Sequence, residues 1–340
     1  MPAKSLALAL TRATGLQALA RHRCRDRLIV LCYHGVVSDD HAAAPYQYRN
    51  TVGASEFAAH LEVLQRRFRV VSADDVLAWV EGGAALPPHA VLITFDDGYR
   101  NNLTVAAPIL RQHGMSALIS VSTDYIGTDR MLWPMEVDLR LGTWAEGRIP
   151  MPDGSTIDRP GDPAAREQLA IEVRRTCKRM PDDARRAYVA RLAEGRPLPL
   201  EARSDEELWR FMNWDEVRQA HAMGMHIASH TCSHPILSRL QPAQLEHELV
   251  ASRRRIEQEV GTCPALVYPN GGPEDVSPEV LAAVERAGYR MAFTLMEQVN
   301  PARPHRHRIE RIGIPGHVGM EPFLFRASGL RSMLAAMWHS

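Results

Sequence analysis

The chain alternates between short apolar runs and longer segments with helical periodicity, and this alternation restricts the possible folds more than any other feature. Each apolar run is rich in Val, Ile and Leu and is followed by a polar or glycine-bearing turn, as is typical of buried strands. Alternating strands and helices predict a parallel sheet with helices outside it, either an open doubly wound sheet or a closed barrel. The predicted strands cover 27–34, 90–95, 116–122, 225–229, 265–268, 289–294 and 311–314, and the predicted helices cover 55–68, 72–83, 101–114, 214–224, 242–261 and 277–288.

One long segment, residues 134 to about 212, interrupts the alternation. It is rich in Arg, Pro and Gly, and its one clear helical pattern lies near 162–180. We interpret it as an insertion into a single barrel domain that spans residues 27–320. A helix at 1–26 is expected before this domain and a helical tail at 321–340 after it.

Charge and cysteine content exclude two classes of function. The 340 residues carry 40 basic and 40 acidic side chains, so no nucleic-acid-binding surface is indicated. The five cysteines are scattered and form no CxxC pair, which argues against a disulfide framework and against a thiolate zinc site. A reducing compartment is the environment that fits this pattern.

The N-terminal segment has a short apolar patch that Arg12 interrupts before it reaches the length of a signal-peptide core. We predict a helix packed on the outside of the domain, with contact to a membrane surface as the alternative. No apolar stretch approaches the length of a transmembrane span. The expected location is the cytoplasm or the inner membrane surface, and the oligomeric state is not predicted. The leucines that could form one helix face are Leu6, Leu10, Leu16 and Leu19.

Two adjacent carboxylates, Asp96 and Asp97, close the apolar run at 90–95. Neighbouring side chains on an unbroken strand point to opposite faces, so the pair can converge only where the strand ends. Gly98 follows directly and allows the backbone to turn there. Acids in loops are mostly solvated, which is the competing interpretation of this pair.

Two histidines, His230 and His234, follow the apolar run at 225–229 and lie four residues apart, within reach of one metal ion. Pro235 disfavours a helical conformation at His234, so we predict a tight loop and not a helical metal motif. One Asp with two His forms a three-ligand set that leaves positions open for water and substrate, as a catalytic zinc requires. A second carboxylate beside such a site can act as general base, although spacing does not decide which aspartate has which role.

Three motifs, TFDDG at 94–98, HTCSHP at 230–235 and YPNGG at 268–272, occur in this order on alternating strand ends. In this respect the chain resembles the polysaccharide deacetylase family, the NodB homology group that includes carbohydrate esterase family 4. The resemblance implies a distorted (β/α) barrel of about seven strands. It further implies that Asp96 is the general base and that Asp97, His230 and His234 hold a divalent metal, zinc foremost, with cobalt, nickel or manganese as alternatives.

The activity implied by this resemblance is hydrolysis of N-acetyl groups from the amino sugars of a glycan, a reaction on the carbon–nitrogen bond of a linear amide. The expected partner is an N-acetylated glycan. An exopolysaccharide made by bacteria, a lipid-linked sugar intermediate, a peptidoglycan fragment and a chitin oligomer all present the required acetamide. A non-catalytic carbohydrate-binding protein of the same fold and a non-heme iron enzyme remain alternatives.

The third motif departs from the family pattern at two positions. Many relatives have an arginine that orients the base where this chain has Val267, and Arg311 is the candidate to supply that charge, with a surface position as the competing interpretation. Asn270 stands where many relatives have an aromatic residue, and its backbone N–H is expected to meet the oxyanion. Gly271 and Gly272 are expected to let the substrate approach the backbone closely.

The general acid is expected to be a histidine, because an amine leaves an amide poorly unless it is protonated. Most relatives draw this residue from a Leu-x-His motif, whereas this chain offers His317 after Pro315 and Gly316. Some relatives that act on exopolysaccharide instead resemble the Tyr33 and His34 pair of this chain. We therefore predict His34 as the proton donor and keep His317 as the alternative.

Overall fold

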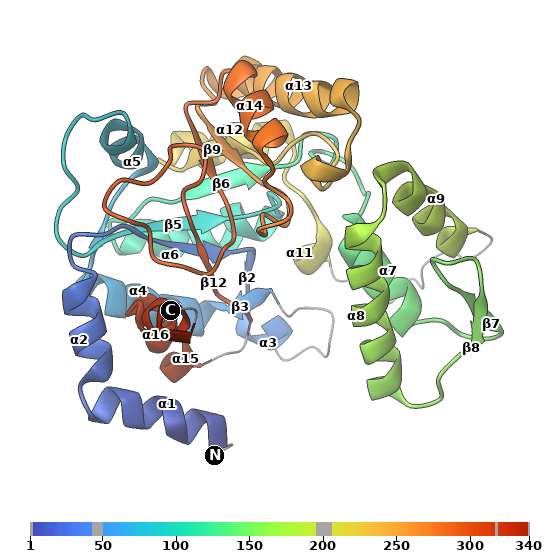
Figure 1. The fold of residues 1–340 in the computed structure, drawn as a ribbon, viewed down its shortest axis with the longest axis horizontal. Helices are drawn as coiled ribbons and strands as arrows, with labels where there is room; N and C mark the ends of the chain where they lie inside the picture. The colour runs from blue at the N-terminus through green and yellow to red at the C-terminus, as the bar shows by residue number, and fades with distance from the viewer. Residues whose placement is uncertain (1–2, 43–49, 195–205, 317–318, 339–340) are drawn as a thin grey trace.

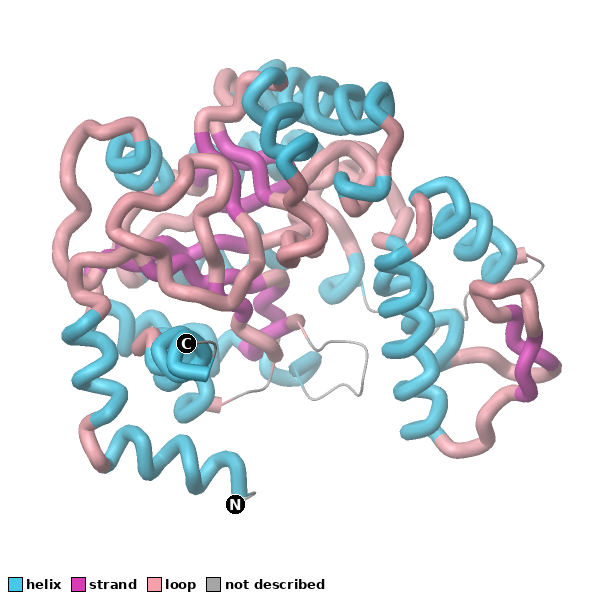
Figure 2. Tube along the Cα trace, viewed as in Figure 1, coloured by secondary structure: helices cyan, strands magenta, loops and turns pink. Residues whose placement is uncertain are grey.

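The computed structural model describes residues 3–42, 50–194, 206–316 and 319–338. Figures 1 and 2 show a central sheet with helices packed around it and a group of helices to one side.

The central sheet is entirely parallel and has the order β11-β10-β9-β6-β5-β1-β12, with β4 pairing with β5. Every residue of β1, β5 and β6 is buried, because core packing covers both faces of the sheet. All seven strands on this path lie within the predicted apolar runs, and β5 has the same first and last residue as its run. The strands are β1 (Ile29–Tyr33), β4 (Arg69–Val70), β5 (Ala90–Phe95), β6 (Leu118–Val121), β9 (His226–Ser229), β10 (Ala265–Val267), β11 (Met291–Phe293) and β12 (Ile312–Gly313).

Successive residues of the central strands face two different cores. Val30 and Leu92 belong to a small cluster that gathers residues from strands all along the sheet and lies on its inner face. Their neighbours Leu31 and Ile93 belong to the larger cluster, which also holds buried residues of the outer helices. The sheet is therefore curled, with one core inside it and one between it and the helices.

The two edges of the curled sheet are joined by a single segment, residues 306–313. The N–H of Thr294, which follows β11, donates to the carbonyl of Ile309 (2.8 Å), and Phe293 bridges Ile309 in parallel. A few residues later Ile312 pairs with Leu31 of β1 at the other edge. The prediction of a distorted barrel of about seven strands is confirmed, and the open sheet is not what forms.

The outer helices match the predicted helical stretches to within a few residues, since their start and stop signals are strong. Asn213 forms a capping box with Glu216 at the start of α12, and Gly261 ends α13 in a left-handed conformation. The stretch at 101–114 differs, because it begins with a π-helical turn at Asn102–Ala106. The helices are α4 (Ala54–Arg67), α5 (Ala73–Val80), α6 (Ala107–Gln112), α12 (Trp214–Ala222), α13 (Pro242–Val260) and α14 (Pro278–Arg286).

The interrupting segment forms a helical lobe with its own apolar core beside the sheet (Figure 1). The sequence indicated α8 but neither α7 and α9 nor the short β7–β8 hairpin. Its core joins Trp133 and Val137 of α7 to Val173 of α8 and Leu192 of α9. The elements are α7 (Trp133–Gly142), β7 (Arg148–Pro150), β8 (Thr156–Asp158), α8 (Pro163–Arg179), α9 (Asp182–Ala193) and α11 (Glu206–Trp209).

The N-terminal segment forms two helices where one was expected, α1 (Ala3–Ala13) and α2 (Leu16–Arg23), because Gly15 adopts a left-handed conformation between them. Leu10, Leu16 and Leu19 are exposed, so these helices contact the domain through other residues, such as the buried Gln17 and Ala20 of α2. In the described part of the chain no helix is long and apolar enough to cross a membrane. The remaining elements are β2 (Gly35–Val37), α3 (Asp39–Ala42), β3 (Thr51–Gly53), α15 (Met320–Ala327) and α16 (Leu330–Trp338).

Candidate metal centre and catalytic cleft

The chemically notable residues of the sequence meet at one edge of the sheet, where the parallel strands end. A cavity of about 350 Å³ lies at this edge. Loops that follow β1, β5, β9 and β10 contribute to it, as expected for a parallel barrel. The predicted site residues that line it are His34, Asp96, Asp97, His230, His234 and Asn270.

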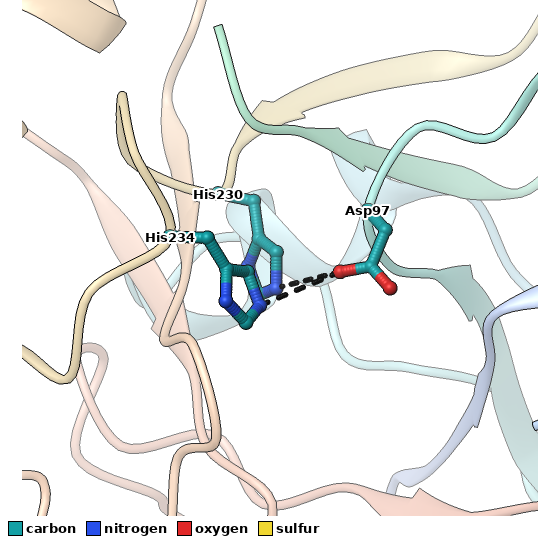
Figure 3. Close-up of side chains that lie close together, drawn as sticks. All are labelled: Asp97, His230 and His234. Atoms are coloured by element: carbon teal, nitrogen blue, oxygen red, sulfur yellow. Dashed lines mark ion pairs between the residues drawn. The ribbon is translucent and has the colours of Figure 1, made fainter. Parts of the chain in front are cut away.

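Asp97, His230 and His234 form a compact group within this cavity (Figure 3). Their ligand atoms all lie within 4.8 Å of one another, and each histidine Nε2 lies 3.5 Å from Asp97 Oδ1. His230 Nδ1 lies 2.8 Å from the Val267 carbonyl, which can only accept, so Nδ1 carries the proton and Nε2 presents its lone pair to the group. Two imidazole nitrogens and one carboxylate oxygen at this spacing fit a divalent cation such as zinc.

Burial and mutual charge leave these ligands in forms that suit a cation. Burial, together with the charge of His230, lowers the pKa of His234 to about 3, so this ring is neutral near pH 7. Burial opposes a charge on His230, but its hydrogen bond to Asp97 and the nearby carboxylates raise its pKa. Burial would raise the pKa of Asp97, yet the same hydrogen bond and the neighbouring histidines lower it.

The backbone at the site is held in a conformation that most residues avoid. Asp97 (φ 75°), Thr231 (φ 67°), His234 (φ 56°) and Asn270 (φ 62°) are left-handed, and they are four of the six such non-glycine residues in the described chain. Each costs on the order of 1 kcal/mol or more, and such strain clusters at functional sites. The left-handed Asp97 is also what turns the two adjacent aspartates toward one cavity, a role the sequence had assigned to Gly98 alone.

Asp96 is buried beside the group of Asp97, His230 and His234, and Arg311 fixes its side chain. The guanidinium forms two bonds to the carboxylate, Nη1 to Oδ1 at 2.6 Å and Nη2 to Oδ2 at 2.9 Å. Burial would raise the pKa of Asp96, but the charges of Arg311 and His230 hold it well below its usual range. Ser120 Oγ adds a hydrogen bond of 3.1 Å to Oδ1.

Arg311 is fully buried, so the competing interpretation of it as a surface residue is wrong. It donates from Nε to the Thr294 carbonyl (2.8 Å) and from Nη1 to Thr94 Oγ1 (3.2 Å), which fixes the plane of the guanidinium. There is no arginine at position 267. Asp96, the carboxylate that such an arginine would orient, is nevertheless bound by an arginine, because Arg311 takes this role. The charge reaches Asp96 from the residue that directly precedes β12.

A buried carboxylate that sequence reasoning missed supports the histidine loop. Glu248 of α13 accepts the backbone N–H groups of Cys232 (2.7 Å) and Ser233 (2.9 Å) and also the Ser233 hydroxyl. Arg186 of α9 donates to the same hydroxyl (2.9 Å), which ties the inserted lobe to this loop. An acid on the buried face of an amphipathic helix was the available signal for Glu248, whereas nothing in the sequence marked Arg186.

Asn270 is held at both ends of its side chain. Lys178 donates to Oδ1, and Nδ2 donates to Asp275 Oδ2 (2.5 Å). The backbone N–H of Asn270 makes no hydrogen bond to any described residue, so it is available to a ligand. Packing within the protein also requires a glycine at Gly271, because a Cβ there would lie 2.9 Å from the Leu295 nitrogen.

His34 and His317 were the two candidates for the proton donor. His34 follows β1 and lines the cavity with the metal group, and its backbone carbonyl accepts a 2.7 Å hydrogen bond from Asn102 Nδ2. His317 lies outside the described residues. The structure thus places one of the two histidines at the cleft and is silent on the other.

Similarity to known proteins agrees with the resemblance drawn from the motifs. Residues 178–292 match the family model described as polysaccharide deacetylase. A Bacillus subtilis protein, YxkH, named as a candidate polysaccharide deacetylase, is 29% identical over 102 residues, which is 30% of this chain and 34% of the relative. The alignment therefore spans about a third of that relative's length.

Solved structures show the same fold at low identity. The Streptococcus pyogenes deacetylase PplD matches with a TM-score of 0.56 and 15% identity over 90% of this chain and 98% of that one. IcaB from Ammonifex degensii matches with a TM-score of 0.56 and 17% identity, over 89% and 96%. A de-N-acetylase from Aggregatibacter actinomycetemcomitans matches with a TM-score of 0.53 and 21% identity, over 84% and 94%. These similarities show a fold shared with the three solved proteins.

Proposed function

This chain shares motifs, a matched segment and its fold with polysaccharide deacetylases, and from that premise we propose that it is a metal-dependent hydrolase of N-acetyl groups on the amino sugars of a glycan. The observation that carries the proposal is the group of Asp97, His230 and His234 beside a buried Asp96 in one cavity. Three ligands and a separate carboxylate are the parts that amide hydrolysis at a metal requires.

Each residue around the cavity has a proposed role in this reaction. A divalent cation held by Asp97, His230 and His234 would polarise the acetyl carbonyl and make water more acidic. Asp96 accepts the proton of the attacking water, and Arg311 fixes the orientation of that carboxylate. The unpaired N–H of Asn270 donates to the oxygen on which negative charge develops.

The last step needs a proton on the nitrogen that leaves. The bond between the acetyl carbon and this nitrogen breaks while His34 delivers a proton to it, so that acetate and a free amine result. His34 lines the same cavity as Asp96, which allows the base and the acid to act on one substrate.

The proposed substrate is an N-acetylated exopolysaccharide or its lipid-linked intermediate. The resemblance of Tyr33 and His34 to relatives that act on exopolysaccharide supports this choice, and the fold shared with a de-N-acetylase supports the N-acetyl group as the point of attack. Exposed Leu10, Leu16 and Leu19 on the N-terminal helices support peripheral contact with a membrane surface, where a lipid-linked glycan would lie.

The alternative of a catalytically impaired carbohydrate-binding protein rested on the arginine missing at Val267. Because Arg311 supplies a buried, two-bond contact to Asp96, that reason no longer favours it. The non-heme iron alternative is disfavoured by the parallel sheet with outer helices, since that class is expected on a β-sandwich.

The proposal is tested by stripping the purified protein with a chelator and reloading it separately with zinc, cobalt, nickel and manganese. We expect about one metal per chain and acetate release from at least one member of a panel of N-acetylated glycans. His230→Ala and His234→Ala should lose both metal and activity, because no neighbour can replace either ligand. Full metal occupancy in the double variant, or no acetate from any glycan with any metal, would contradict the proposal.

A further inference from the structure

Lys178 lies in the last turn of α8, in the inserted lobe, and its side chain lines the cavity that contains the metal group. It is half-buried and donates to Oδ1 of Asn270, 92 residues away in the sequence. One turn earlier on the same helix, Arg174 pairs with Asp138 of α7 at 2.6 Å. No described carboxylate forms an ion pair with Lys178 itself.

An ammonium group in this position is unfavourable for folding. Burial and the charge of Arg174 lower the pKa of Lys178, and Asp275 and Asp138 oppose this shift only in part. An apolar side chain of similar length would fill the same space without the cost of desolvating a charge. A charged group kept in a cleft against this cost suggests a role in the chemistry of the site.

The partner of Lys178 indicates what that role is. Asn270 is left-handed (φ 62°), and its side chain is held by Lys178 on one side and by Asp275 on the other. Asp275 Oδ2 also accepts the Gly272 N–H at 2.7 Å, which fixes the next turn of the loop. Together these bonds fix the loop around Asn270, and so the direction of its backbone N–H, which the proposed mechanism uses as a donor.

We propose that Lys178 is a positioning residue for the oxyanion site: it holds Asn270 so that its backbone N–H points into the cleft, and it adds positive charge where the acetyl oxygen becomes negative. This inference rests on the proposed deacetylation and extends it, because it makes the inserted lobe a part of the catalytic site. The sequence alone indicated only an insertion here, with no role in the chemistry of the site.

The test compares Lys178→Met and Lys178→Arg with a control, Arg179→Met. Arg179 is exposed, and its side chain makes no hydrogen bond or ion pair with a described residue. We expect Lys178→Met to lower kcat by roughly ten- to a hundredfold, less than the loss of a direct oxyanion donor, with KM and metal content unchanged. Lys178→Arg should restore part of the rate, since it keeps the charge. The control should match the wild type.

The pH profile separates positioning from a merely structural role. The groups that face Lys178 are Arg174 on its own helix, Asp138 on α7 and Asp275 after β10. With its pKa lowered, Lys178 loses its proton at alkaline pH and kcat should fall there. In Lys178→Arg this fall should move to higher pH, because a guanidinium stays charged.

Binding of acetate to the zinc-loaded protein, measured by calorimetry, gives a readout that does not depend on turnover. Lys178→Met should bind acetate about tenfold more weakly than the control, because acetate places negative oxygens where the oxyanion would form. Wild-type acetate affinity, wild-type kcat, or a loss of rate that follows a loss of metal would each overturn the inference. If the wild type hydrolyses no glycan while Lys178→Met still weakens acetate binding, the proposed function fails and the role of Lys178 stands.

Discussion

At the level of single residues, Asp96 and Asp97 are neighbours with opposite surroundings. Asp97 faces two histidines at 3.5 Å, whereas Asp96 faces the guanidinium of Arg311 at 2.6 Å. Spacing along the sequence did not separate these roles, because either carboxylate at the end of β5 could reach the histidines. The left-handed backbone of Asp97 is what separates them.

Replacing each aspartate by asparagine should therefore give different defects. We expect Asp96→Asn to keep its metal but to lose hydrolysis by a hundredfold or more, since the base is gone. It should also lower the melting temperature, because Arg311 is left buried without a counterion, which costs about 3–5 kcal/mol. Asp97→Asn should weaken metal binding itself. Metal analysis, acetate release and calorimetry on both variants check this, and the reverse pattern would mean that the two roles are exchanged.

His34 is expected to matter only where the leaving group needs a proton. His34→Ala should slow release of acetate from an N-acetyl sugar by about a hundredfold or more, with normal metal content. An activated aryl acetate should lose far less, because a phenolate departs unaided. The exposed His22 of α2 supplies the control, His22→Ala. Equal losses on both substrates would move the proton donor to His317.

Several residues of the site could be predicted from the sequence, and others could not. His230 and His234 were candidate ligands from their spacing at a strand end, whereas the choice of Asp97 over Asp96 came only from the family resemblance. Arg311 was a candidate, but its burial depends on the far edge of the sheet. Lys178 could not be predicted, because its role arises only when the inserted lobe packs against the loop after β10.

At the level of elements, α13 supports the candidate metal centre although it carries none of the proposed ligands. Its buried Glu248 accepts two backbone N–H groups of the histidine loop, which fixes the path between His230 and His234. A loop with left-handed residues at Thr231 and His234 needs such support, because neither conformation is favoured in isolation.

Glu248→Gln should weaken metal binding while the barrel stays folded. The amide would place a donor against N–H groups that need an acceptor, and we expect about a tenfold or greater rise in the metal dissociation constant. Glu246→Gln is a matched control, since Glu246 is exposed on the same helix. Competition with a fluorescent chelator measures the affinity. Equal affinities in the two folded variants would show that Glu248 does not position the ligands.

The elements themselves were predicted with differing success, and the reasons are physical. Strands such as β5 and helices such as α13 carry uninterrupted patterns and clear caps, so their existence and approximate ends follow from local sequence. The β2–β3 pair and β4 have only two or three residues each, too few for a pattern. The break between α1 and α2 depends on one left-handed glycine, which also left no periodic signal.

At the level of the whole molecule, the barrel and the inserted lobe divide the site between them. The barrel supplies the proposed metal ligands and Asp96, and the lobe supplies Met135, Arg174 and Lys178 to the walls of the same cavity. The lobe gives way to the barrel before Phe211, because Phe211 and Met212 belong to the main core, whereas Leu208 packs in a small cluster with Leu139 of α7.

Replacing residues 134–207 by a short linker should therefore leave a folded barrel that still binds metal. Its affinity for the metal should fall modestly, because the bond from Arg186 to Ser233 is lost. The preference among N-acetylated glycans should change, since part of the cleft wall is gone. Circular dichroism, metal analysis and acetate release from the glycan panel check these outcomes. An unchanged preference would show that the lobe does not shape the cleft.

The position of Arg311 on the segment that joins both sheet edges has a consequence for the order of events in the cell. Asp96 and the arginine that orients it are separated by 215 residues. At the usual speed of translation, roughly 10 to 40 seconds pass after the ribosome makes Asp96 before Arg311 exists. A nascent chain therefore exposes its proposed base without its partner for that time. Completion of the barrel and activation of the base become a single late event, so that a half-made molecule has no competent site.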